Sequence, residues 1–405
     1  MRFFTRKAVS ASVLLAVLIA LAYAAYAILP ASLSREDDAA LARREVELCK
    51  SATTEAEKEI CYQKEVPKLM DEDLTLERAF VVTQKILDLD PGYQSCHVLA
   101  HLLSAKEVSK DPEKWKDVVS RVPTGICGTG ALHGAFQERF KTDSLKGVSV
   151  ETMREMLAGV CDKHGEWNPT LLDRSSCMHG MGHLFLYVTD ADVKKSVELC
   201  SALANLPDFD FRQTCYEGVF MQTNQPLDKD DEALTHKLAA SIKNVPKFCG
   251  QFAAGLVRNT CIKEGWAQDL RTVTTPEGYE ALCKQTSPDY WSYCAGANVF
   301  AVIETLHYDL PKILGLCRGL KDQNFKNLCW ARTAVKVIWA DYRNTQKAID
   351  ICTEAPEQSK ATCWEYLTNH AEQGWHPDTP EAKALCGGMP EPWRSTCATR
   401  TRTVL

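Results

Sequence analysis

The pattern of hydrophobic and polar positions begins with one long apolar segment. After three basic residues near the start, an uncharged apolar run extends from Ala8 to Leu29. A helix of roughly 20 apolar residues is long enough to cross a bilayer. The basic residues before it predict a cytoplasmic N-terminus and an exported body. We therefore expect residues 1–30 to form a single transmembrane anchor, and the Ala22-Tyr-Ala24 pattern leaves cleavage as a signal peptide open.

Helix signals recur along the rest of the chain. A charged segment, 31–48, could form a stalk or a capping helix. Further on, Thr275-Pro-Glu and Thr379-Pro-Glu each open a mixed apolar and polar segment. Thr at the N-cap, Pro at the first helical position and Glu in the first turn favour a helix start. Each such helix A ends near a cysteine, and after a short connection a second cysteine opens helix B, as in the segment from Cys363 to Gly374.

The 18 cysteines place these helical hairpins at a fixed period. In the C-terminal half, paired cysteines lie 11 or 12 residues apart, and successive pairs begin 34 or 35 residues apart. Such a period indicates stacked repeats. An even number of cysteines without a CxxC motif indicates disulfides formed in an oxidising compartment. The predicted pairs are Cys49–Cys61, Cys96–Cys127, Cys161–Cys177, Cys200–Cys215, Cys249–Cys261, Cys283–Cys294, Cys317–Cys329, Cys352–Cys363 and Cys386–Cys397.

This period and cysteine placement resemble tetratricopeptide-like and especially Sel1-like repeats, whose cysteine-rich secreted members carry one disulfide per helical hairpin. The consensus residues of tetratricopeptide repeats are not in register, so the resemblance implies an architecture and no functional residue. The expected fold is all-α: a solenoid of αα-hairpin repeats with about one disulfide per hairpin, preceded by one transmembrane helix. We expect N-terminal helical repeats over 49–240 and regular repeats of 34 residues over 241–405.

The charge of the chain bears on its partners and location. The formal net charge is −6 and no basic stripe is present, which argues against a nucleic-acid partner. The expected partners are the membrane, through the N-terminal helix, and proteins that bind the solenoid surface. We expect a cell-membrane location with the body on the periplasmic or extracellular side.

Candidate chemistry is concentrated in the N-terminal repeats. Five of the ten histidines lie at the starts of three successive B helices: His97, His101, His133, His179 and His183. The His-x-x-x-His spacing places two imidazoles on one helix face, one turn apart, which suits two ligands on one metal. In the next repeat, Glu217 stands where His179 stood. The remaining histidines are expected at surfaces or interfaces: His164, His236, His307, His370 and His376.

Glycine recurs at the same register as these side chains, at Gly134, Gly180 and Gly218. Glycine inside a helix costs about 0.5–1 kcal/mol relative to alanine. Its recurrence therefore predicts a close approach of neighbouring helices, or of a ligand to the backbone.

The sequence supports two functional hypotheses. In the first, the five histidines bind zinc, iron or copper in a one-metal or two-metal site, with Glu217 as a further ligand or general base. A three-ligand site with an open position could activate water or oxygen, so an enzyme is one outcome. In the second, the histidines are structural, and the body is a scaffold or a spacer. Partner contacts would then come from tryptophans of the C-terminal repeats: Trp291, Trp330, Trp364, Trp375 and Trp393.

Overall fold

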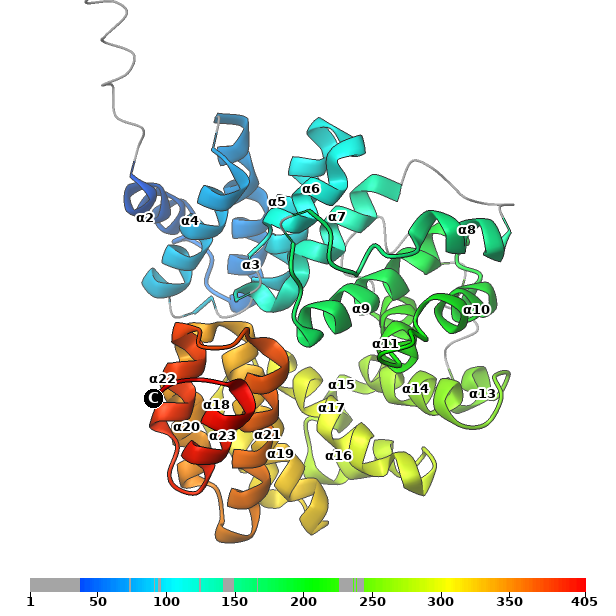
Figure 1. Cartoon of the computed structure of the whole chain (residues 1–405), viewed down its shortest axis with the longest axis vertical. Helices are drawn as coiled ribbons and strands as arrows, with labels where there is room; N and C mark the ends of the chain where they lie inside the picture. Colours follow the sequence, from blue (N-terminus) through cyan, green and yellow to red (C-terminus); the bar gives the residue numbers. More distant parts are fainter. Residues whose placement is uncertain are drawn as a thin grey trace, which may run out of the picture.

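The chain is all-helical over the residues that the structure describes, as predicted (Figure 1). The structure is a computed structural model, and it describes residues 37–405 except 73, 91, 94–95, 124, 141–148, 166, 226–235, 237 and 239–243. The predicted anchor, residues 1–30, lies outside the described residues. Within the described ranges, no helix combines the length and the apolar character needed to cross a membrane.

Successive helices form pairs, each with a first helix, A, and a second helix, B. The A helices are α2 (Asp38–Leu48), α4 (Leu76–Leu89), α6 (Trp115–Arg121), α8 (Val150–Leu157), α10 (Val193–Leu203), α13 (Val245–Cys249), α16 (Pro276–Cys283), α18 (Leu310–Gly319), α20 (Thr345–Glu354) and α22 (Pro380–Gly388). The B helices are α3 (Glu55–Glu65), α5 (His97–Lys110), α7 (Gly130–Phe140), α9 (Leu171–Val188), α11 (Arg212–Asn224), α14 (Leu256–Glu264), α17 (Trp291–Thr305), α19 (Gln323–Ala340), α21 (Glu357–Gly374) and α23 (Trp393–Thr401).

Shorter helical segments connect these pairs. They are η1 (Val66–Glu72), η2 (Pro112–Lys114), η3 (Cys127–Thr129), η4 (Gly265–Asp269), α15 (Leu270–Val273), η5 (Pro288–Tyr290) and η6 (Tyr342–Asn344).

The predicted helix starts are confirmed by their caps. The Thr275 hydroxyl accepts a hydrogen bond from the Gly278 backbone nitrogen, and Thr379 does the same for Ala382. In both helices proline occupies the first turn, where its missing N–H group costs nothing. These local signals fix where α16 and α22 begin.

The predicted starts of α19 and α21 are wrong by six residues, whereas α5 begins directly after Cys96, as predicted. We expected the second cysteine of each pair to open its helix, but α21 begins at Glu357, before Cys363. Similarly, α19 begins at Gln323, before Cys329. Both cysteines are buried, and each is bonded to the cysteine of its helix A. Gly374 does end α21, as predicted.

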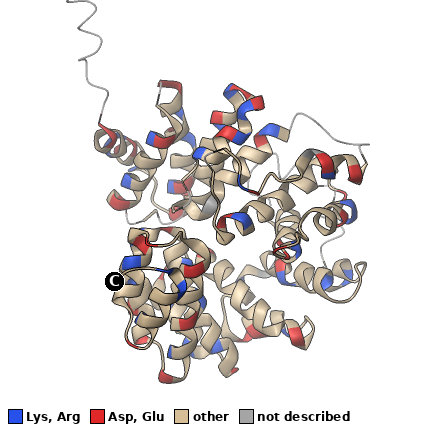
Figure 2. Cartoon of the chain, viewed as in Figure 1, with Lys and Arg blue, Asp and Glu red and all other residues tan. Residues whose placement is uncertain are grey.

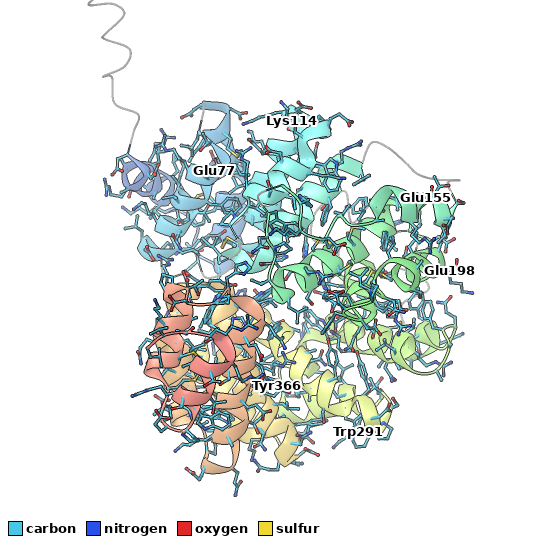
Figure 3. All side chains as sticks on the ribbon, viewed as in Figure 1. Glu77, Lys114, Glu155, Glu198, Trp291 and Tyr366 are labelled. Carbon is cyan, nitrogen blue, oxygen red and sulfur yellow. A yellow bond between two sulfur atoms is a disulfide. The ribbon has the colours of Figure 1, made fainter. Side chains whose placement is uncertain are left out.

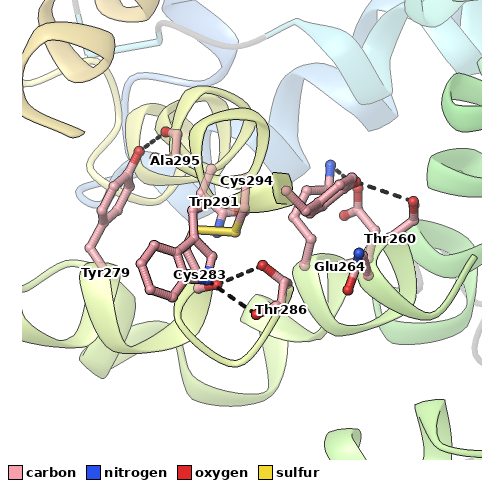
Figure 4. The surroundings of a disulfide bond; sticks show 12 residues. Thr260, Glu264, Tyr279, Cys283, Thr286, Trp291, Cys294 and Ala295 are labelled. Atoms are coloured by element: carbon pink, nitrogen blue, oxygen red, sulfur yellow. Dashed lines mark hydrogen bonds and ion pairs between the residues drawn. A yellow bond between two sulfur atoms is a disulfide. The ribbon is translucent and has the colours of Figure 1, made fainter. Parts of the chain in front are cut away.

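The structure contains the nine disulfides that the cysteine spacing predicts, with Cα–Cα separations of 4.9–5.7 Å. Most link the two helices of one pair; Figure 4 shows the Cys283–Cys294 bond between α16 and α17. Beside it, the Trp291 indole N–H donates to the Thr286 carbonyl at 3.1 Å. Cys96–Cys127 instead joins consecutive pairs, because it links the start of α5 to η3.

The B helices pack against one another in chain order. Helix α5 packs on α7, α7 on α9 and α9 on α11, and α17, α19 and α21 continue the same arrangement. Buried apolar residues form two clusters, one from Leu41 to Ile262 and one from Tyr279 to Cys397. This packing places equivalent positions of α5, α7 and α9 beside one another.

The C-terminal helices fold back onto the N-terminal ones (Figure 1). At this seam, the Tyr342 backbone N–H donates to the Gly125 carbonyl at 3.2 Å. The Arg343 guanidinium pairs with Asp88 at 2.8 Å. Helices far apart in the sequence therefore meet at this seam.

Charged side chains of both signs are interspersed over the ribbon (Figure 2). Of the charged residues labelled in Figure 3, Lys114, Glu155 and Glu198 lie at the periphery of the molecule. Side chains fill the space between the helices in the same view (Figure 3).

Candidate metal centre

The structure brings the five histidines of the N-terminal repeats together in one cluster. Helix α5 contributes His97 and His101, α7 contributes His133, and α9 contributes His179 and His183. The centroids of neighbouring rings lie 4.9–5.3 Å apart. Because the three B helices pack side by side, histidines at equivalent positions of their sequences lie close together in space.

Two of the recurring glycines explain how the helices come so close. A Cβ atom at Gly134 of α7 would lie 2.0 Å from the carbonyl oxygen of His101 on α5. A Cβ atom at Gly218 of α11 would lie 2.0 Å from the carbonyl oxygen of His179 on α9. Real Cβ atoms do not approach backbone oxygens so closely, so glycine is required for these crossings. The predicted reason for the glycine register, close helix approach, is confirmed.

His97 and His101 have the geometry of two ligands on one ion. Their Nε2 atoms are 3.2 Å apart. Two nitrogens bound tetrahedrally to zinc at 2.0–2.1 Å would lie roughly 3.3 Å apart. The Cys127 carbonyl lies 3.2 Å from His97 Nδ1 and can only accept, so the hydrogen of His97 is on Nδ1 and Nε2 carries a lone pair.

His133 completes a group of three. His97, His101 and His133 each offer a nitrogen within 4.8 Å of the other two, close enough to bind one metal ion. His133 is buried, and among the described residues neither of its ring nitrogens has a hydrogen-bond partner. An unpartnered buried polar atom costs about 1–3 kcal/mol. Gly180 leaves room for this imidazole, since a Cβ there would lie 2.8 Å from its Cδ2.

The second pair, His179 and His183, repeats the geometry of the first. Their Nε2 atoms are 3.1 Å apart. The Gln222 side-chain oxygen accepts from His183 Nδ1, and the Thr214 backbone carbonyl accepts from His179. Acceptors outside the cluster thus orient both rings, as outer partners of metal-binding histidines do.

Burial lowers the pKa of all five histidines below the ordinary value. For His183 the pKa falls to about 4. The neighbouring imidazoles lower the pKa of His101, His133 and His179 further, because a second positive charge in the cluster would be repelled. At neutral pH the rings are therefore uncharged, which is the form that binds metal ions.

Glu217, predicted as a ligand or general base, lies in a different set of contacts. Its carboxylate accepts from the Lys263 ammonium at 2.8 Å and from the Tyr293 hydroxyl at 2.6 Å. The positive charge of Lys263 also lowers the pKa of His179, so this ion pair lies near the second histidine pair. Glu217 is not among the three side chains that can share one ion.

A pocket of about 360 Å³ opens beside His97 at the seam. Within it, Lys336 pairs with Glu304 at 2.7 Å, and the Tyr308 hydroxyl donates to Glu304 at 2.8 Å. Its lining comes from both halves of the chain: Leu87, Asp88, Tyr93, Cys96, His97, Cys127, Gly128, Glu304, Tyr308, Lys336, Ala340, Asp341, Arg343, Asn344 and Lys347.

Apart from His97 and the Cys96–Cys127 disulfide, the residues of this pocket were not predicted from the sequence. One feature of the sequence does point to this pocket. Lys336 is a lone lysine within the otherwise apolar stretch at the end of α19. A charged side chain in such a stretch is buried only with a partner. Here the partner is Glu304 of α17, which no local pattern identifies.

Three of the remaining histidines lie at interfaces, as expected. His307 approaches the Glu55 carboxylate at 3.4 Å, and His376 Nε2 lies 2.8 Å from the Asn168 carbonyl oxygen. Both contacts join C-terminal to N-terminal segments. His370 is buried outside the cluster, and burial lowers its pKa to about 4.

The tryptophans of the C-terminal repeats contribute to packing. Trp330, Trp364 and Trp375 are buried. Trp291 and Trp393 are partly buried against the same core. These side chains therefore fill the space between helices, and the partner surface considered for them in the scaffold hypothesis is not formed by the three buried ones.

Comparison with known proteins adds no functional residue to this set. No protein-family model, curated protein or solved structure matches the chain. The candidate residues are those that the fold itself brings together.

Proposed function

We propose that the protein binds a transition metal ion through His97, His101 and His133. The main support for this proposal is the group of three imidazoles whose nitrogens lie within 4.8 Å of one another. The unpartnered nitrogens of buried His133 support it, because a bound ion would satisfy one of them. Neutral imidazole nitrogens suit zinc, iron and copper, and these are the proposed ions.

The pocket beside His97 supports a metal-dependent enzyme over a closed structural site. An ion held by three protein nitrogens retains a position at which water or oxygen can be activated. His97 both belongs to the ligand group and lines the pocket. A small substrate could therefore reach the site without unfolding of the surrounding helices. The Lys336–Glu304 pair would then provide a cation and a carboxylate next to the substrate.

We further propose that the helix pairs form one curled repeat array of the Sel1-like kind, held in an extracytoplasmic compartment. Disulfides within nearly every pair, and the packing of consecutive B helices, support the repeat array. The nine disulfides also support an oxidising location. The anchor proposed for residues 1–30 would attach the body to the membrane.

The test is the metal content of the full chain, produced in an oxidising compartment and purified without a chelating tag. Elemental mass spectrometry should find a transition metal in the wild type, and His133→Phe should lose it. His370→Phe is the matched control, since it removes another buried histidine outside the cluster.

Retention of metal by His370→Phe would show that loss in His133→Phe is specific to the site. A wild type that stays metal-free after incubation with zinc, copper and iron(II) salts would contradict the proposal. Far-UV circular dichroism checks that each variant keeps its helical content.

A further inference from the structure

The two histidines on α9, His179 and His183, support a further inference. His179 and His183 match the first pair in spacing: their Nε2 atoms are 3.1 Å apart, against 3.2 Å for His97 and His101. Both values lie close to the roughly 3.3 Å expected between two nitrogens on one tetrahedral ion. Yet neither residue belongs to the group of three that can share the first ion.

Acceptors outside the cluster take hydrogens of the second pair. The Gln222 oxygen can only accept, so His183 carries its hydrogen on Nδ1 and a lone pair on Nε2. The Thr214 carbonyl can also only accept, so His179 donates a hydrogen to it. The lone pair of His183 Nε2 faces His179 Nε2 at 3.1 Å and is available to a cation.

His133 lies between the two pairs. Its ring centroid is 5.3 Å from His97 and 5.1 Å from His101, and on the other side 5.3 Å from His179 and 4.9 Å from His183. Two nitrogens of one buried ring thus lack hydrogen-bond partners among the described residues. In the neutral ring one of these nitrogens carries the hydrogen, and the other offers its lone pair to a metal ion.

We propose that His179 and His183 bind a second metal ion, so that the five histidines form a two-metal centre with His133 between the ions. This proposal rests on the proposed function of the first site. It identifies the centre as one in which two ions act on the same small ligand.

Charge balance indicates what else such a centre would bind. The carboxylates of Glu304 and Glu217 are already paired with Lys336 and Lys263. Two divalent ions among neutral imidazoles would therefore leave excess positive charge in a buried site, which is costly. We expect the loaded centre to take up an anionic ligand of the hydroxide or oxyanion class.

The test removes the metal from the full chain with a chelator and reloads it with Zn²⁺ alone. After removal of excess salt, the wild type should retain two zinc ions per chain. His179→Gln/His183→Gln should retain one, and so should His97→Gln/His101→Gln. The control variant His164→Gln/His376→Gln, outside the cluster, should retain two.

Two results would overturn the second site. One is a wild type with a single ion that His179→Gln/His183→Gln also retains, which leaves the first site standing. The other is a wild type with two ions of which the same variant loses none. A wild type without any bound ion would overturn both the first and the second site.

A second readout does not depend on the variants. The wild type loaded with Cu²⁺ alone should show a broadened electron paramagnetic resonance signal, because the unpaired spins of two copper ions on either side of one imidazole ring interact. A full mononuclear signal at two coppers per chain would contradict the shared centre.

Discussion

At the scale of single residues, the candidate centre depends on small side chains as much as on its histidines. Glycines let α5 approach α7, and α9 approach α11, at backbone contact distance, and Gly180 of α9 leaves room for the His133 imidazole of α7. The sequence predicted both the histidines and the glycines, since each recurs at one register of successive repeats. It did not predict that Glu217 would pair with Lys263, because that contact depends on the orientation of two side chains from different repeats.

Gly134→Ala tests this role of glycine. The new Cβ would lie 2.0 Å from the His101 carbonyl oxygen, so α5 and α7 must separate. We expect the free energy of unfolding to fall by about 1–3 kcal/mol, and metal affinity to fall with it. Gly315→Ala is the control: nothing lies within 4 Å of its Cβ position in α18, so it should stabilise by roughly 0.5–1 kcal/mol. Equal effects in denaturant unfolding would refute the close approach.

His370 lies outside the candidate metal centre, and its burial should make the stability of the fold depend on pH. Burial, and then the charge of Arg332, lowers its pKa to about 4 in the folded chain. In the unfolded chain the value is about 6.5. Between these pH values only the unfolded chain binds the proton, so the free energy of unfolding falls as the pH falls. The full loss from this residue is about 3 kcal/mol below pH 4.

His370→Phe should flatten that dependence by the same amount. Unfolding in denaturant at pH 7 and at pH 4.5, for wild type and variant, measures the difference between the two slopes. Identical slopes would show that His370 takes up its proton equally well in both states.

At the scale of helices, the prediction of the helix pairs depended mostly on the spacing of the cysteines. A cysteine near the end of one helix and another early in the next define each pair, and all nine disulfides follow that rule or its predicted exception, Cys96–Cys127. The start of α21 was missed because Pro356, which precedes it, provides no side-chain cap. The start of α19 does have a cap, Asp322, but the cysteine spacing does not record it.

Removal of the exceptional disulfide should affect the site as well as stability. Cys96→Ala/Cys127→Ala opens a loop with a sequence separation of 31, and we expect a loss of about 4 kcal/mol. Cys386→Ala/Cys397→Ala, with a separation of 11, should cost about 3 kcal/mol. Only the first should weaken metal binding, since the Cys127 carbonyl orients His97. Equal metal content in both variants would contradict that link.

At the scale of the whole molecule, the seam between the chain halves could not be predicted from the sequence. It joins residues as far apart as Asp88 and Arg343, and no local pattern records such a contact. The same seam forms the pocket beside His97 and brings Lys336 and Glu304 to it. Local periodicity identified the histidines of the cluster, and only the closure of the fold shows the pocket that opens beside His97.

Arg343→Ala tests whether the seam controls access to the centre. Exposed ion pairs such as Arg343–Asp88 are worth about 0–1 kcal/mol, so the fold should persist. We expect a chelator to remove bound metal up to about fivefold faster, the factor equivalent to 1 kcal/mol. Arg400→Ala, which breaks the exposed Arg400–Glu372 pair away from the pocket, is the control and should keep the wild-type rate. A rate unchanged in both variants would place the access route elsewhere.

The most direct test of the metal centre is anomalous X-ray diffraction from crystals of the protein soaked in zinc, copper or iron(II) salts. Data collected on either side of the absorption edge locate the ion itself. We predict an anomalous peak about 2.0–2.2 Å from one ring nitrogen each of His97, His101 and His133. Fully soaked crystals without a peak among these three imidazoles, for all three metals, would contradict the account.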